Sequence, residues 1–175
     1  MLDFTIVQYL NGPFVLNGFA LAQRKVNDMK ILDLSAGNRA VWFNKNHSMT
    51  IYLDKRKEVK PTIVCDTRSI PKSVGSGFGL ICWDPPHMNC GKNSNMSRVY
   101  GYHTTAEILD TIEKTGHEVH RISKKNALMA FKWNTHDIKL KRVFDLLPKW
   151  EPLFGHLTKD GPGSQTYWVM FRRLP

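Results

Sequence analysis

Short runs of branched and aromatic apolar residues recur along the chain and alternate with segments of helical pattern. The runs are too short for helices, and most lack the polar alternation of a strand with one face in water, so each predicts a buried strand. They span residues 31–34, 50–53, 62–64, 79–83, 127–131 and 167–171. Strands that alternate with helices predict an α/β fold, with a mostly parallel sheet covered by helices on both faces.

Two helices are expected in the second half of the chain. The first begins at Thr104, because Glu107 lies at the spacing of a capping box. Its apolar face comprises Ile108, Ile112, Val119 and Ile122, although Gly116 interrupts the pattern. The second helix begins near Asp137 and ends before Pro148.

The last part of the chain predicts a β-hairpin. Asp160, Gly161 and Gly163 supply turn residues between two strand-like runs within residues 152–171. The hairpin adds an antiparallel strand to the sheet.

Size and charge narrow the class of protein. A chain of 175 residues, 42% of them hydrophobic, is long enough for one well-filled domain and too short for two, so residues 1–175 are expected to form a single domain. The formal net charge of +10 favours a polyanionic partner such as nucleic acid.

The cysteines and the N-terminus indicate the compartment. Cys65, Cys82 and Cys90 have no CxxC spacing, so neither a disulfide framework nor a cysteine zinc site is expected, and a reducing, cytoplasmic compartment fits best. No basic segment precedes an apolar core at the N-terminus, and no apolar run reaches the length of a membrane span. The chain is therefore predicted to be soluble, with no membrane partner.

Four successive predicted strands are followed by an aspartate: Asp33, Asp54, Asp66 and Asp84. Aspartate is common after strands as a turn former, so any one of the four has an ordinary structural explanation. Ligands of open α/β sheets bind beyond the carboxyl ends of the strands, and four carboxylates at that edge favour a ligand site.

The turn after the first strand restricts the ligand. A dinucleotide fingerprint needs GxGxxG, but Ser35, Gly37 and Ala40 occupy those three places, so only the middle glycine is present. This argues against NAD or FAD. A nucleoside ligand that has no pyrophosphate places fewer demands on this turn. It needs one glycine, so that the backbone can approach the ligand closely, and an acid such as Asp54 to bind the ribose hydroxyls. A helix is expected to follow the turn.

The order "ILDLSAGNR", "YLDKR", "CDTR" and "WDPPH" resembles that of class I S-adenosylmethionine-dependent methyltransferases, in the amino-methylating branch marked by Asp-Pro-Pro and an aromatic residue. The stretches "FKWN" (131–134) and "PLFGH" (152–156) resemble small phage- and prophage-type enzymes. The resemblance covers about residues 29–172. It implies a Rossmann-like seven-stranded sheet with a reversed last strand.

The resemblance also implies the roles of individual residues. Asp33 and Gly37 border the methionine part of S-adenosylmethionine, Asp54 binds the ribose and Asp66 the adenine amino group. The whole cofactor set is Asp33, Ser35, Ala36, Gly37, Asp54, Asp66 and Thr67, and the catalytic set is Asp84, Pro85, Pro86 and His87.

The form of the catalytic stretch suits attack by an exocyclic amine, whose lone pair is delocalised into the base. A carboxylate and a backbone carbonyl that accept its two N–H groups localise the lone pair and stabilise the incoming positive charge. Asp84 is the first acceptor and the carbonyl of Pro85 the second, while the prolines fix φ and remove competing donors. Methyl transfer from a sulfonium needs no metal, so none is expected.

His87 stands where this branch has an aromatic residue. It is expected to stack on the target base, with contact to a phosphate or acceptance of a proton as alternatives. The other histidines are interpreted as structural or surface residues. Lysines and arginines such as Lys55 and Arg56 are candidates for a phosphate track or for ordinary solvated surface.

Substrate contacts are expected from residues outside the strand ends. Those predicted are Lys92, Arg98, Tyr100, Tyr102, Lys132 and Asn134. The loop 88–102 either contacts nucleic acid or acts as an ordinary flexible lid. A homodimer or a partner subunit is an option for reading sequence.

Three hypotheses follow. The first is a nucleic-acid amino methyltransferase acting on N6 of adenine, preferably in DNA. The second keeps the chemistry but changes the substrate to RNA, a protein side chain or a small amine. The third is a degenerate, nucleic-acid-binding partner subunit, suggested by the depleted glycine turn and by His87.

Overall fold

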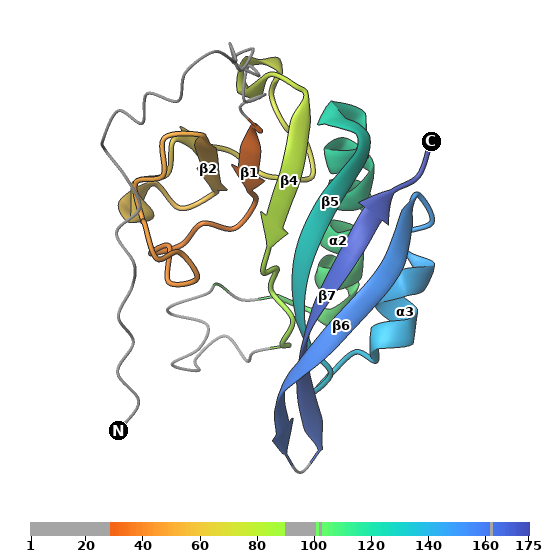
Figure 1. Ribbon diagram of the computed structural model, residues 1–175. Coiled ribbons are helices and arrows are strands. Elements are labelled where there is room, and N and C mark those ends of the chain that lie inside the picture. The colour runs from red at the N-terminus through yellow and green to blue at the C-terminus, as the bar shows by residue number, and fades with distance from the viewer. Residues whose placement is uncertain (1–28, 90–100, 102, 162) are drawn as a thin grey trace, which may run out of the picture.

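A computed structural model describes residues 29–89, 101, 103–161 and 163–175. They form one seven-stranded sheet of order β3-β2-β1-β4-β5-β7-β6 (Figure 1). The strands are β1 (Ile31–Asp33), β2 (Thr50–Asp54), β3 (Ile63–Val64), β4 (Phe78–Trp83), β5 (Ser123–Asn134), β6 (Trp150–Gly161) and β7 (Ser164–Arg173). All pairs from β3 to β5 are parallel, and β7 is antiparallel to both of its neighbours. The predicted Rossmann-like sheet with its reversed strand is confirmed.

The chain order creates a switch point between β1 and β4. From β1 the chain moves outward through β2 and β3, then returns to form β4 on the other side of β1. The connections leaving β1 and β4 therefore diverge at their carboxyl ends, which is where open α/β sheets bind ligands.

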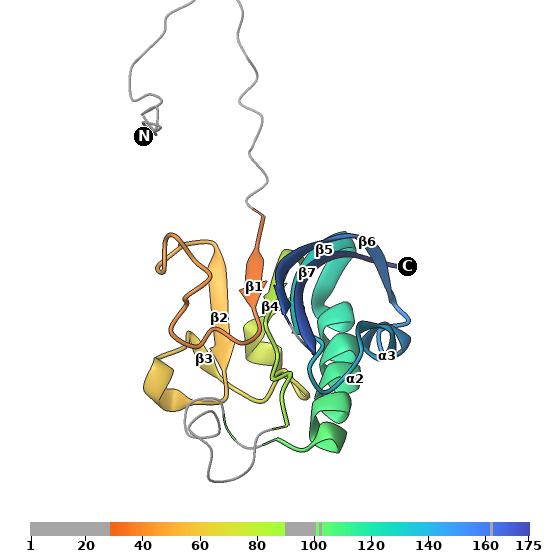
Figure 2. The same ribbon diagram turned by 90° about the horizontal axis from the view of Figure 1, so that it is seen from below.

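Two α-helices, α2 (Thr105–Ile122) and α3 (Leu140–Asp145), cover the sheet. Both lie on the same side of the β5–β7–β6 arch, as Figure 2 shows. The expectation of helices on both faces is not met within the residues described above. The core lies on the helix-bearing face, where Trp83, Phe131 and Trp133 are almost fully buried.

The predicted capping box of α2 is present. The Thr104 hydroxyl accepts from the Glu107 backbone N–H at 3.2 Å, and the Glu107 carboxylate accepts from the Thr104 N–H at 2.7 Å. The helix continues through Gly116. A Cβ at this position would overlap the buried Leu147 side chain, and the Gly116 carbonyl accepts from Trp150 Nε1 at 3.1 Å. Close packing therefore explains this glycine.

Two predicted helices differ in the structure. The second helix starts later than expected, at Leu140, since the Ile138 carbonyl accepts a hydrogen bond from Trp133 Nε1 at 2.9 Å instead of opening a helix. The helix expected after Gly37 is wrong, because residues 38–49 form consecutive turns. Arg39 has a left-handed φ of 57°, which ends any right-handed helix there, and its guanidinium donates to the Lys45 carbonyl at 2.6 Å.

Candidate active site

The four strand-end aspartates line one cleft of about 650 Å³ at the switch point. Of the other predicted site residues, Ser35, Ala36, Gly37, Thr67, Pro85, Pro86, His87 and Lys132 line it too. The cleft has the size of a typical small-molecule site, and its polar groups come from four different strand ends. The sheet topology thus brings together residues that are up to about a hundred positions apart in the sequence.

Asp33 lies at the floor of the cleft and is 2% exposed. One carboxylate oxygen accepts from the Ser35 backbone N–H at 3.1 Å, and the other accepts from Trp42 Nε1 at 2.6 Å. Burial raises the pKa of Asp33 to about 6, although both hydrogen bonds partly offset this, and the charges of Asp84 and Asp54 raise it further.

This pKa predicts a pH-dependent cost in stability. The folded state holds the Asp33 proton more tightly than the unfolded chain, so the free energy of unfolding falls as the pH rises from 3.8 to about 6. The free energy of unfolding of the wild-type chain should therefore fall by roughly 1 to 3 kcal/mol as the pH rises through this range, and Asp33→Asn should lack that fall. The variant should also carry a cost that does not depend on pH, because its amide NH2 cannot accept one of the two N–H groups that the carboxylate binds. Urea unfolding of both proteins across this range measures the difference, and the same pH dependence in both would contradict the explanation.

Asp54 joins the first turn to the second strand. Its carboxylate accepts from the Gly37 N–H at 2.9 Å and pairs with the Arg56 guanidinium at 3.0 Å. Gly37 has a φ of +49°, which glycine adopts without strain. Burial alone would raise the pKa of Asp54, but the hydrogen bonds from Arg56 and Gly37 outweigh it and lower the pKa. Asp54 is therefore a buried carboxylate held in its charged form.

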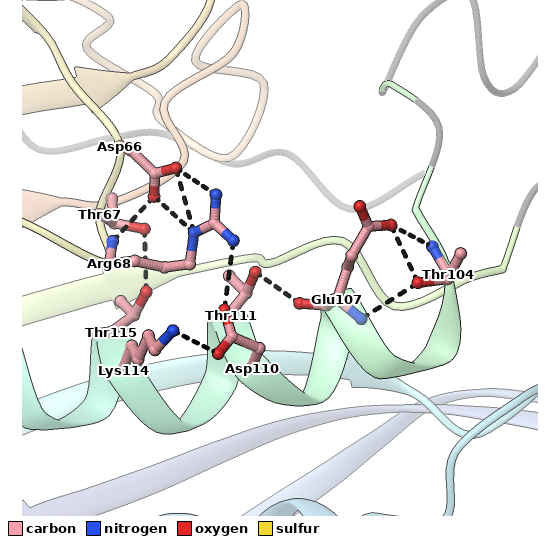
Figure 3. A network of polar contacts seen from close by, with 9 residues as sticks. All are labelled: Asp66, Thr67, Arg68, Thr104, Glu107, Asp110, Thr111, Lys114 and Thr115. Atoms are coloured by element: carbon pink, nitrogen blue, oxygen red, sulfur yellow. Dashed lines mark hydrogen bonds and ion pairs between the residues drawn. The ribbon is translucent and has the colours of Figure 1, made fainter.

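Asp66 lies at the rim of the cleft and is linked through Arg68 to the polar contacts of α2 in Figure 3. Its carboxylate accepts from the Arg68 guanidinium at 2.6 Å, and Arg68 also donates to Asp110 of α2 at 3.2 Å. Hydrogen bonds from Arg68 lower the pKa of Asp66. Next to it, the Thr67 hydroxyl lies 3.0 Å from that of Thr115, so the loop after β3 is fixed to α2 through both Thr67 and Arg68 (Figure 3).

Asp84 follows β4 and is linked to two neighbouring strand ends. Its backbone N–H donates to the Ser35 hydroxyl at 3.0 Å, and its carboxylate accepts from Lys132 Nζ at 2.7 Å. Ser35 therefore connects the turn after β1 to the strand that carries Asp84. The side chains of Asp84 and Lys132 remain 27% and 31% exposed, so both reach the cleft.

The His87 side chain contacts the backbone of its own segment. Its Nδ1 lies 3.0 Å from the Pro85 carbonyl, and because a carbonyl only accepts, Nδ1 carries the hydrogen. The imidazole lies edge-on to Trp133, with ring centroids 6.1 Å apart. One lone pair of the Pro85 carbonyl is thus already used, and the second is left for another donor.

Asn134 is not part of the cleft, which corrects the prediction of a substrate contact. Its side-chain amide donates to the Thr166 hydroxyl at 2.9 Å and accepts from the His136 N–H at 2.9 Å. These bonds secure the end of the β5–β7 pair. The other predicted substrate residues, Lys92, Arg98, Tyr100 and Tyr102, lie outside the described residues.

The cleft also contains residues that were not among the predicted cofactor, catalytic or substrate residues. Arg56, a candidate for phosphate contact, is bound to Asp54, and Arg68 repeats the arrangement on Asp66. The two Asp-x-Arg stretches are visible in the sequence and are the signal that could have predicted these pairs. His103, interpreted as structural or surface, lines the cleft at 8% exposure, with Nε2 3.5 Å from Lys55 Nζ.

Among the described residues, no cluster of histidine, cysteine and acidic side chains has the arrangement of a metal site. No described helix is both long enough and apolar enough to cross a membrane.

Known proteins resemble this chain in structure. No family model matches the sequence, and no curated protein is similar to it. TrmN from Thermus thermophilus superposes with a TM-score of 0.58 at 12% identity, over 84% of this chain and 44% of that chain. The chain thus spans under half of TrmN.

Two further structures match over most of their own length. An S-adenosylmethionine-dependent methyltransferase from Clostridium acetobutylicum ATCC 824 has a TM-score of 0.58 at 11% identity, over 85% of each chain. An rRNA methylase from Streptococcus thermophilus has a TM-score of 0.53 at 10% identity, over 85% of this chain and 89% of that one. At these identities the likeness shows a shared fold.

Proposed function

We propose that this chain transfers a methyl group from S-adenosylmethionine to an exocyclic amino group of a nucleic-acid base, with N6 of adenine in DNA as the first candidate. The observation that carries the proposal is the rigid Asp84-Pro85-Pro86-His87 segment at the tip of β4, which faces the same cleft as the buried Asp54 and Gly37. The shared fold with an S-adenosylmethionine-dependent methyltransferase supports it. The one sheet and one core cluster formed by the residues that the structure describes support a single domain.

The cleft fits the proposed cofactor. Its volume of about 650 Å³ suits a nucleoside with an amino-acid arm, and the charged Asp54 carboxylate would accept from ribose hydroxyls in place of the Arg56 side chain that now binds it. Asp33, Ser35, Ala36 and Gly37 would border the amino-acid arm, while Asp66 and Thr67 at the rim would border the adenine. When bound, the cofactor supplies an activated methyl group on a sulfonium, so no metal is needed.

The chain's own residues would prepare the amine. Asp84 and the free lone pair of the Pro85 carbonyl accept the two N–H groups and draw the nitrogen toward tetrahedral geometry. As the amine nitrogen bonds to the methyl carbon and the methyl–sulfur bond breaks to leave a neutral thioether, positive charge would develop on the nitrogen beside the Asp84 carboxylate, which would stabilise it. The methylated nitrogen then releases a proton to Asp84 or to water. The His87 ring, at the mouth of the cleft, would contact the target base.

RNA is the second candidate substrate, because one structural neighbour is an rRNA methylase. The formal charge of +10 suits either nucleic acid. A homodimer or a partner subunit would supply sequence recognition. The described thiols Cys65 and Cys82 are free, which fits a reducing, cytoplasmic compartment.

The test is incubation of the chain and methyl-labelled S-adenosylmethionine with separate pools of DNA, RNA and protein, followed by mass spectrometry of the nucleosides. N6-methyladenine in the DNA pool is the expected product. Label confined to RNA or protein would overturn the DNA assignment. Cofactor binding without transfer to any pool would favour a partner subunit over an enzyme.

A further inference from the structure

We infer that Lys132 and Asp84 together recognise the target amino group and the ring nitrogen beside it, so that the substrate is a base with N6–H and N1 of adenine, or N4–H and N3 of cytosine, side by side. This inference rests on the proposed function and deepens it, because it assigns Lys132 to one atom of the base. Lys132 is then a specificity-determining residue and does not act on the reacting nitrogen.

The sheet itself places the two side chains together. β4 and β5 are parallel neighbours with Trp83 in register with Phe131, so the next residues of each strand, Asp84 and Lys132, emerge side by side. Lys132 Nζ lies 2.7 Å from Asp84 Oδ2, and both side chains line the cleft while remaining about one-third exposed. The donor and the acceptor are therefore adjacent and within reach of a ligand.

Lys132 and Asp84 can still form hydrogen bonds to a ligand while they are bonded to each other. An ammonium has three donors and a carboxylate about four acceptor sites, so one bond between Lys132 and Asp84 leaves both groups able to bind a ligand. Adenine presents an N6 donor beside the N1 acceptor, and cytosine presents N4 beside N3. The amino donor would meet Asp84 and the ring nitrogen would meet Lys132.

The same pair disfavours other amines. An alkyl ammonium, as in a protein lysine, has no neighbouring acceptor for Lys132 and carries a like charge. A base that lacks the ring nitrogen leaves a Lys132 donor without its partner, which costs more than the loss of a neutral contact.

Lys132 is expected to act on binding more than on the chemical step. Donation from Lys132 to the ring nitrogen withdraws electron density from the amine, which opposes methyl transfer. The benefit of this contact should therefore lie in KM, whereas a catalytic group would change kcat.

The test combines a base analogue with a variant. Oligonucleotides carry adenine, 1-deazaadenine or 7-deazaadenine at the methylated position, and steady-state methyl transfer is measured with the wild-type chain and with Lys132→Met. The 1-deaza base lacks only the predicted partner of Lys132, and the 7-deaza base is the matched control for ring chemistry. Lys125→Met is the control variant, since Lys125 is an exposed lysine of the same strand.

For the wild-type chain, 1-deazaadenine should lower kcat/KM about 10- to 100-fold, mainly through KM, and 7-deazaadenine should have little effect. In Lys132→Met the 1-deaza penalty should disappear, because the variant and the analogue remove the same contact. Lys125→Met should behave like the wild type.

Two outcomes would overturn the inference. A 1-deaza penalty that persists in Lys132→Met means that another group reads N1. No penalty in the wild-type chain means that N1 is not read. Methylation of ordinary adenine or cytosine by the wild-type chain tests the proposed function separately, and the absence of methyl transfer to every nucleic acid would overturn both.

Discussion

Asp84→Ala is expected to lower methyl transfer about 100- to 1,000-fold while leaving the dissociation constant for S-adenosylmethionine unchanged. The Asp84 carboxylate is a charged acceptor on the proposed path of the amine, next to Lys132. Its removal takes away stabilisation that grows as positive charge develops on nitrogen, so the loss should appear in kcat. Single-turnover transfer together with calorimetric cofactor binding measures both quantities.

Two controls separate this effect from misfolding. Asp145→Ala removes an exposed carboxylate of α3 that pairs only weakly with Lys141, and it should leave transfer intact. Asp84→Asn keeps a neutral acceptor of the same shape and should retain more activity than Asp84→Ala. If Asp84→Ala loses cofactor binding to the same extent as transfer, Asp84 belongs to the cofactor site and its proposed role is wrong.

The order of strands and helices could be predicted because local signals are strong in this chain. Branched apolar runs located the strands, and the Thr104–Glu107 spacing located the start of α2. The segment after Gly37 could not be predicted in the same way. Its turns depend on the left-handed Arg39 and on the bond from Trp42 to Asp33, which are tertiary features with no periodic signature.

The carboxylates of the site could be located from sequence, but their partners could not. The rule that ligands bind at the carboxyl ends of strands brought Asp33, Asp54, Asp66 and Asp84 to one cleft, as observed. The prediction treated these groups as free to bind ligand. Folding instead places Arg56 on Asp54, Arg68 on Asp66 and Lys132 on Asp84, so these three acids have a counter-ion before any ligand binds. Only the short Asp-x-Arg pattern hints at this, since pairing across strands depends on register.

For Asn134 the sequence prediction failed in a different way, because the side chain does not line the cleft. Lys132 and Asn134, which were both predicted to contact substrate, are two residues apart on β5 and share a face of the sheet. The side chain two residues farther along lies beyond the cleft, where it bonds to Thr166 of the adjacent strand. Position along a strand therefore decides between a ligand contact and a structural one.

The counter-ion already present at Asp54 affects how strongly a mutation there should weaken binding of the proposed cofactor. Arg56 holds the Asp54 carboxylate in its charged form and fixes its orientation, and the Gly37 N–H donates to the same oxygen, Oδ2, as Arg56 Nη2. Donors from Gly37 and Arg56 fill all four acceptor positions of Asp54, so ribose hydroxyls must replace the Arg56 side chain and then satisfy a buried carboxylate in its place. Asp54 should therefore matter for binding far more than a flexible surface acid would.

Asp54→Ala is accordingly expected to weaken S-adenosylmethionine binding about 100-fold or more, the reverse of the pattern for Asp84→Ala. The change removes both proposed ribose contacts, releases the Gly37 N–H and leaves the Arg56 guanidinium without its carboxylate. The double variant Asp54→Ala/Arg56→Ala tells these causes apart. If the stranded charge alone were responsible, the double variant would recover affinity in calorimetric titration, whereas loss of the ribose acceptor predicts that it stays weak. Full cofactor affinity in Asp54→Ala itself would show that the cofactor lies elsewhere in the cleft.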